Sequence, residues 1–99
     1  MPLPAGSDDR DYLEVFDTIL AEDLDRFQPQ LLLVSAGFDA HQGDPLAGMW
    51  LTAGGFGALC GRVRALAERH AQGRLLLVLE GGYRLDTLGE CVAACLGAL

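Results

Sequence analysis

The chain has 99 residues, which is enough for one small domain, and 51% of them are hydrophobic, too many for a disordered tail. Its formal net charge is −7 and its seven basic residues are scattered, so it lacks the clustered positive charge that nucleic acids and anionic membranes require. No apolar run approaches the roughly 20 residues that span a bilayer, and the N-terminus does not resemble a secretory signal. We therefore expect a cytoplasmic globular unit that binds neither nucleic acid nor membrane.

The three cysteines, Cys60, Cys91 and Cys95, form an odd set without the spacing of a disulfide framework. Reduced thiols are the simplest interpretation. Cys91 and Cys95 are four residues apart and would share a helix face, which leaves a metal pair open. Small buried core residues are the favoured interpretation, because free cysteine is among the most buried residue types.

The first predicted element is an amphipathic helix over residues 8–27. It follows an extended lead-in that contains two prolines and a glycine, and Ser7 is the predicted N-cap. Pro29 is expected to stop the helix. The inward positions recur at steps of three and four residues and are Tyr12, Phe16, Ile19 or Leu20, Leu24 and Phe27.

Two further helices and two strands complete the predicted order. The segments 31–37 ("LLLVSAG") and 74–83 predict strands covered on both faces, as in parallel sheets. A second helix is expected over residues 53–71, capped by Thr52 and ended by Gly73, with Phe56, Leu59, Val63 and Leu66 inward. A third helix should begin at Asp86 or Thr87, with Leu88, Val92, Cys95 and Leu96 inward.

The order helix, strand, helix, strand, helix predicts parallel strands joined by a right-handed crossover. The loops that follow the two strands should then meet at one edge of the sheet, where ligands bind in open parallel sheets. Asp39 lies in the first of these loops and Tyr83 in the second. Two interior-type strands cannot form a complete sheet alone, so we expect the chain to be part of a larger sheet.

The first loop carries three polar candidates, Asp39, His41 and Asp44. Asp39 at a strand end could be a metal ligand or general base, or it could cap local backbone amides, and its residue type leaves both open. His41 makes a D-x-H pair with Asp39, but a lone histidine in such a loop is more often an ordinary polar residue. Asp44 precedes Pro45, which favours a structural turn.

The second loop carries the motif "EGGY", residues 80–83. Gly81 and Gly82 permit a tight turn or the close approach of a ligand. A phosphate site is weakly supported, because G-x-G-x-x-G and the P-loop lysine are both absent. Tyr83 could be a packing residue or a hydrogen-bond donor to a developing oxyanion.

The stretches "SAGFDAHQGDPLAGMWLT" and "LVLEGGY", separated by one helix, resemble the C-terminal part of the histone deacetylase family. The resemblance is strongest to its class II-like bacterial branch, which includes acetylpolyamine amidohydrolases and acetoin-utilisation proteins. The lead-in "PLPAGSDDRDYL" also resembles the segment before these motifs. The resemblance implies that residues 1–99 are the C-terminal portion of such a domain, with a partial three-layer α/β fold of the arginase and deacetylase type.

The family resemblance also implies a zinc-dependent amide hydrolase that acts on acetyl-lysine or acetylated polyamines. Matched to the family motifs, Asp39 would be a zinc ligand and Tyr83 would polarise the acetyl carbonyl and stabilise the tetrahedral intermediate. Gly81 and Gly82 would line the acyl channel. His41 is left out of the metal site, because the histidine at that place in the family motif is not a ligand.

The sequence also departs from the family pattern. The family's G-x-H-H histidine pair and its upstream D-x-H ligands are absent, and the only histidines are His41 and His70. One zinc ligand of three remains, and no general base is evident. We expect the isolated chain to be inactive and to need an upstream segment or a partner chain. The alternative is a non-catalytic truncated module that self-associates or pairs with a partner through exposed strand edges.

Overall fold

The computed structural model describes residues 2–99, and its elements follow the predicted order. An N-terminal helical arm consists of α1 (Asp9–Val15), the wider π-helical turn η1 (Phe16–Leu20) and α2 (Ala21–Phe27). The remaining elements are β1 (Leu32–Ala36), α3 (Ala53–His70), β2 (Leu75–Leu79) and α4 (Leu85–Ala98). The third predicted helix therefore begins one or two residues earlier than expected.

The helical arm begins at Asp8 and not at the predicted Ser7. The Asp8 carboxylate accepts hydrogen bonds from the amides of Arg10 and Asp11, and the Asp11 carboxylate accepts one from the Asp8 amide, which completes a capping box. The Ser7 hydroxyl is buried and donates instead to the carbonyl of Pro4 at 2.8 Å. Ser7 thus stabilises the lead-in, and its neighbour caps the helix.

The helical arm ends at Phe27, two residues before Pro29, because Gln28 takes a left-handed conformation with φ of 53°. Phe16 and Leu24 face the sheet as predicted. Phe27 does not, since 79% of its surface is exposed. The last turn still contacts the end of α3, where Asp25 accepts a hydrogen bond from Arg69, so Phe27 lies on the solvent side of this turn.

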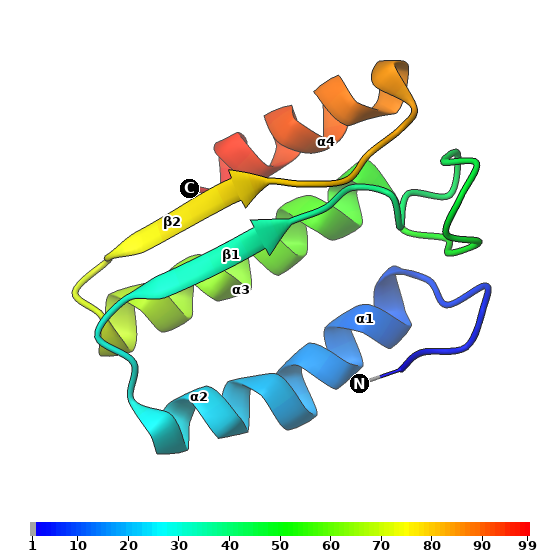
Figure 1. The fold of residues 1–99 in the computed structure, drawn as a ribbon. Coiled ribbons are helices and arrows are strands. Elements are labelled where there is room, and N and C mark those ends of the chain that lie inside the picture. Colours follow the sequence, from blue (N-terminus) through cyan, green and yellow to red (C-terminus); the bar gives the residue numbers. More distant parts are fainter. Residues whose placement is uncertain (1) are drawn as a thin grey trace.

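Strands β1 and β2 pair in parallel, as the crossover length predicts, with Leu32 opposite Leu75 and Ala36 opposite Leu79. Both arrows in Figure 1 point toward the same end of the molecule, and the loops that follow them emerge there together. The prediction that the loop after β1 and the loop after β2 meet at one edge is therefore confirmed.

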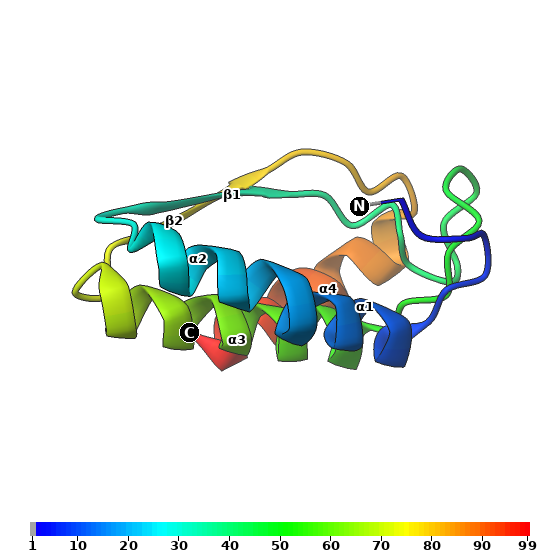
Figure 2. The same ribbon diagram turned by 90° about the horizontal axis from the view of Figure 1, so that it is seen from below.

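All helices lie on one side of this two-stranded sheet, as Figure 2 shows. Leu32 is buried on the helix side, whereas Leu33 is 66% exposed and Leu76 53% exposed on the other. The expectation that both faces would be covered is wrong for this chain alone. The α/β arrangement is that expected for part of a three-layer fold, with the sheet and one helical layer present.

The main core forms where α3 and α4 pack beneath the sheet. Phe38 and Phe56 meet edge to face with their ring centroids 5.0 Å apart. The free thiols of Cys60, Cys91 and Cys95 are all buried in or beside this cluster, which confirms that they are core residues. Leu96, predicted to face inward, is 66% exposed, and Cys91 and Cys95 supply the buried face of α4 in its place.

A single carboxylate joins the helical arm to the start of α3. Asp9 accepts hydrogen bonds from the amide of Thr52 at 2.8 Å and from its hydroxyl at 2.6 Å. The Thr52 hydroxyl accepts in turn from the amide of Gly55, which confirms Thr52 as the N-cap. Gly55 has no side chain where one would collide with Asp9, so the arm can lie directly against the end of α3.

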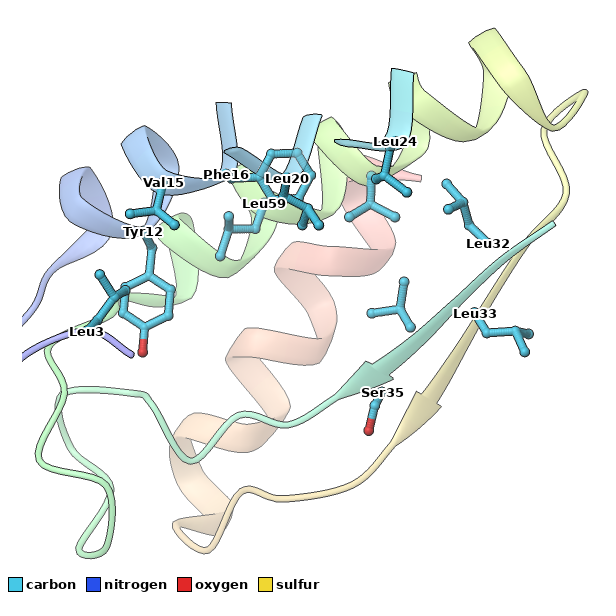
Figure 3. Close-up of a pocket in the computed structure, with 12 residues that line it drawn as sticks. Leu3, Tyr12, Val15, Phe16, Leu20, Leu24, Leu32, Leu33, Ser35 and Leu59 are labelled. Atoms are coloured by element: carbon cyan, nitrogen blue, oxygen red, sulfur yellow. The ribbon is translucent and has the colours of Figure 1, made fainter. Parts of the chain in front are cut away.

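Between the helical arm and β1 lies an apolar cleft of about 480 Å³ (Figure 3). Its lining comes from the inner face of the arm, from β1 and from α3, and includes Tyr12, Phe16, Leu24, Leu33 and Leu59. The cleft runs along the edge of β1 that does not pair with β2. Among residues 2–99 the helices are too short or too polar to cross a membrane.

We predict that the purified chain self-associates through the open face of its sheet. Apolar side chains on an unpaired sheet are the usual site of strand and sheet association. Replacing Leu33 and Leu76 together by lysine should shift the chain toward monomer in sedimentation velocity experiments. The matched control replaces Leu46 and Leu85, which are 68% and 79% exposed and lie outside the sheet, by lysine. A wild-type chain that sediments as one monomer and melts cooperatively would contradict this prediction.

We also predict that the three thiols resist alkylation in the folded chain. Burial raises the pKa of Cys95 to about 12 and also raises the pKa of Cys60 and of Cys91. Because iodoacetamide reacts with the thiolate, labelling at pH 8 should be at least about 100-fold slower than in the urea-unfolded chain. Mass spectrometry of labelled peptides would measure each site. Equal rates in the folded and unfolded chains would show that α4 does not stay docked.

Candidate active site

The two loops at the sheet edge continue the pairing of β1 and β2 beyond the strands. The amide of Glu80 donates to the carbonyl of Ala36 at 3.0 Å, and the amide of Phe38 donates to the carbonyl of Gly81 at 2.9 Å. These bonds place Asp39 on one loop beside Gly81 on the other, and Phe38 beside Gly82. This is the position that the parallel topology predicts for a ligand site.

Asp39 lies directly against the second loop, and a Cβ atom on Gly81 would be 3.1 to 3.2 Å from the atoms of its carboxylate. Across residues 2–99 its carboxylate accepts no hydrogen bond and forms no ion pair. The other aspartates of the described chain all have such a partner, namely Asp8, Asp9, Asp11, Asp17, Asp23, Asp25, Asp44 and Asp86. The interpretation of Asp39 as a cap for local amides is therefore wrong, and its oxygens are available to a ligand.

Gly81 and Gly82 have distinct structural requirements. Gly81 leaves room for the Asp39 carboxylate. Gly82 has a φ of 129°, a conformation that residues with a side chain rarely adopt, and a Cβ there would lie 2.9 Å from Leu88 and 3.2 Å from Phe38. The glycine pair therefore brings a bare backbone close to Asp39 at the edge of the sheet.

Tyr83 follows this bare backbone, and 59% of its surface is exposed. The interpretation of Tyr83 as a packing residue is wrong, because the side chain is not part of the core. Its backbone amide donates to a carboxylate oxygen of Asp44 at 2.8 Å. Sequence reasoning predicts Asp44 as a turn residue, and its other oxygen does accept from the Leu46 amide at 3.0 Å. The bond to Tyr83, 39 residues away, leaves no signal in the sequence.

Neither histidine is placed as a partner of Asp39. His41 is buried, and its Nδ1 atom accepts a hydrogen bond from the Gly43 amide at 3.0 Å, so it acts as a structural residue of the loop. His70 lies at the far end of α3, where its Nε2 atom contacts Asp25 at 2.6 Å. The hydrogen bond from His70 and, to a smaller extent, that from Arg69 lower the pKa of Asp25.

Tyr12 is a neighbour of the site that sequence reasoning places only in the core. Its pKa is raised by burial and, to a smaller extent, by the negative charge of Asp39. Tyr12 lines an apolar pocket together with Gly37 and Phe38, the two residues before Asp39. The helical spacing predicts that Tyr12 faces inward, but it cannot predict that the charge of Asp39 acts on its hydroxyl.

A zinc site needs three protein ligands for catalysis, and the described part of the chain does not contain a group of three histidine, cysteine or acidic residues that could hold a metal. Asp39, which is half-buried, is compatible with one ligand position because its carboxylate has no hydrogen-bond or ion-pair partner among the described residues. The remaining ligands are not among residues 2–99, so these residues do not form a zinc site by themselves.

Comparison with known proteins identifies the family. The profile of the histone deacetylase domain matches residues 1–99. The chain is 46% identical over 93 residues to histone deacetylase 10, chloroplastic, of Oryza sativa subsp. japonica, covering 94% of this chain and 21% of that protein. It is 49% identical over 81 residues to the histone deacetylase-like amidohydrolase of Pseudomonas aeruginosa, covering 82% and 21%.

A solved structure supports the same assignment. The structure of the histone deacetylase Clr3 superimposes with a TM-score of 0.87 and 31% identity, covering 97% of this chain and 16% of that one. The chain spans about a fifth of the length of the curated relatives that it matches. The matching profile, relatives and fold show that the chain belongs to the histone deacetylase domain family.

Proposed function

We propose that this chain supplies one metal ligand and the oxyanion-binding tyrosine of a zinc-dependent deacetylase that removes acetyl groups from acetyl-lysine or acetylated polyamines. The observation that carries the proposal is the Asp39 carboxylate, which has no hydrogen bond or ion pair within the described chain and lies against Gly81. Tyr83 lies at the same edge of the sheet, directly after the glycine pair, and its side chain is exposed. The match to the histone deacetylase domain supports deacetylation as the reaction in which Asp39 and Tyr83 would act.

Asp39 would hold zinc together with two ligands from outside residues 1–99. An anionic oxygen ligand suits Zn²⁺, and zinc bound there would polarise the acetyl carbonyl and lower the pKa of a bound water. The bare backbone at Gly81 and Gly82 would let an extended acyl chain pass close to Asp39. No side chain at these two positions competes for that space.

The role of Tyr83 would be to donate its phenolic hydrogen to the acetyl oxygen as negative charge develops there. Such a donor acts mainly on the transition state, because the oxygen accepts a much stronger hydrogen bond once it is charged. The exposure of Tyr83 supports this role, since a phenol committed to the core could not reach a substrate.

The rest of the site would come from a segment seated on the unpaired edge of β1. The amide of Leu32 donates to the carbonyl of Arg74, and the carbonyl of Ala36 accepts from the amide of Glu80. Alternate residues of β1 therefore direct their backbone groups toward β2, and the backbone groups of Leu33 and Ser35 face the unpaired edge. These groups border the apolar cleft beside the helical arm (Figure 3). A parallel strand inserted there would satisfy them, and without it we expect the chain to be inactive.

A chimaera tests the proposal. The matching segment of the Pseudomonas aeruginosa amidohydrolase would be replaced by this chain, which is 49% identical to it over 81 residues. We expect the chimaera to bind zinc and to hydrolyse an acetyl-lysine peptide or an acetylated polyamine. Tyr83→Phe should lower kcat by about 10² to 10³-fold, the usual effect of removing an oxyanion donor, with zinc content unchanged. Asp39→Asn should lower zinc content, measured by atomic absorption.

The matched control is Asp23→Asn, which removes the same charge from an exposed pair on the helical arm. It should leave both zinc content and kcat at the values of the unsubstituted chimaera. An unchanged kcat in Tyr83→Phe would remove the proposed role of the tyrosine. A folded chimaera that binds zinc and shows no hydrolysis would overturn the proposal as a whole.

A second candidate function is a non-catalytic module that pairs with a copy of itself or with another protein. The uncovered face of the sheet and the free edge of β1 favour it. A discrete dimer of the wild-type chain, together with a folded chimaera that neither binds zinc nor hydrolyses the acetylated substrates, would support this candidate over the deacetylase. Zinc-dependent hydrolysis by the chimaera would argue against it.

A further inference from the structure

The carboxylate of Asp44 joins the two loops of the candidate site. One oxygen accepts from the amide of Leu46 at 3.0 Å, which is the ordinary bond of a turn. The other accepts from the amide of Tyr83 at 2.8 Å. Among residues 2–99 the structure gives Tyr83 no other hydrogen bond to any segment of the chain. The orientation of the Tyr83 backbone therefore depends on its charge-assisted hydrogen bond to Asp44.

The loop that presents Asp44 is itself well anchored. His41 is buried, and its Nδ1 atom accepts from the Gly43 amide at 3.0 Å. The amide of Asp44 donates to the His41 carbonyl at 2.8 Å, which closes the turn. Leu51, which is fully buried, donates its amide to the Ala40 carbonyl at 3.1 Å. Asp44 thus reaches toward Tyr83 from a rigid support.

A second contact holds the residue after Tyr83 to the same loop. The Arg84 guanidinium donates to the carbonyl of Gly43 at 3.2 Å. The approach is close enough that a Cβ atom on Gly43 would lie 3.1 Å from the Nη1 atom of Arg84. Residues 43 and 44 therefore bind residues 83 and 84 through one hydrogen bond each. The absence of a side chain at Gly43 makes room for Arg84.

Tyr83 needs such support, because the usual ways of fixing a side chain are missing. It follows two glycines, and Gly82 has a φ of 129° that its neighbours must maintain. The Tyr83 side chain is largely exposed, so packing does not orient it. A donor that acts on a developing oxyanion must nevertheless be held close to one geometry to contribute its full effect.

We propose that Asp44 is a positioning residue for Tyr83, holding its backbone amide so that the phenol points toward the acyl group at Asp39. This inference rests on the proposed function, because it assigns Asp44 a role in aiming the oxyanion donor. Asp44 does not touch substrate and acts only through Tyr83. The contact to Leu46 explains the turn but does not require the second bond to a residue 39 positions away.

A double-mutant cycle in the chimaera tests the inference. Asp44→Asn keeps the size of the side chain but leaves a single acceptor oxygen for two amides. We expect it to lower kcat by about tenfold with KM within about twofold, since a small misplacement of a catalytic group can cost up to about 100-fold. In the Tyr83→Phe background the same substitution should change kcat by less than about twofold, because the donor that it aims is already gone.

The outcomes separate the inference from the proposed function. If Asp44→Asn lowers kcat equally with and without Tyr83→Phe, Asp44 acts on the fold as a whole. If Asp44→Asn leaves kcat unchanged in the chimaera that keeps Tyr83, Asp44 does not position that residue. Either result overturns the inference. An unchanged kcat in Tyr83→Phe alone would instead overturn the proposed role of Tyr83. Asp23→Asn is again the control for loss of one negative charge.

Hydrogen exchange gives a readout that does not depend on activity. In Asp44→Asn the amide of Tyr83 should exchange at least about tenfold faster, because it loses its acceptor. The amide of Phe38, bonded to Gly81 in the same pair of loops, is the internal control and should not change. Faster exchange at both amides would mean that the loops have separated, and unchanged exchange at Tyr83 would mean that the bond does not hold it. Both results would contradict the inference.

Discussion

The parallel pairing of β1 with β2 determines where the candidate site of this chain is located. With Ala36 opposite Leu79, the next residues of both strands leave the sheet at the same edge. The bond from Phe38 to Gly81 then carries the register two residues further, to the point where Asp39 meets the glycine pair. A slip of the register would separate these residues. The helices beneath the sheet maintain the register by covering alternate residues, with Leu32 of β1 buried and Leu75 and Leu77 of β2 partly buried.

The two aspartates of the first loop have opposite roles although they are only five residues apart. Asp44 satisfies two backbone amides and so ties one loop to the other. Asp39 satisfies none, and its oxygens lie against a backbone without side chains. This absence of a partner within the described chain is the reason that we propose Asp39 as a ligand residue.

Much of this arrangement could be predicted from the sequence because it depends on local patterns. Apolar runs of strand length, the caps at Thr52 and Gly73, and the crossover length lead to the parallel sheet and to the meeting of Asp39 with the glycine pair. The departures come from tertiary contacts. Asp8 caps the first helix in place of Ser7, Phe27 is exposed, and Asp44 accepts a hydrogen bond from Tyr83, 39 residues away. Periodicity cannot predict such contacts, since each depends on where a distant segment lies.

The open face of the sheet also affects how long the chain can persist. A fold that leaves Leu33, Leu76 and Val78 in contact with water while no complement is present displays the kind of surface that chaperones and proteases recognise in cells. Under the proposed function, the segment that completes the active site would also cover this surface. A copy of this chain without that segment would then be degraded sooner than a copy whose sheet is covered.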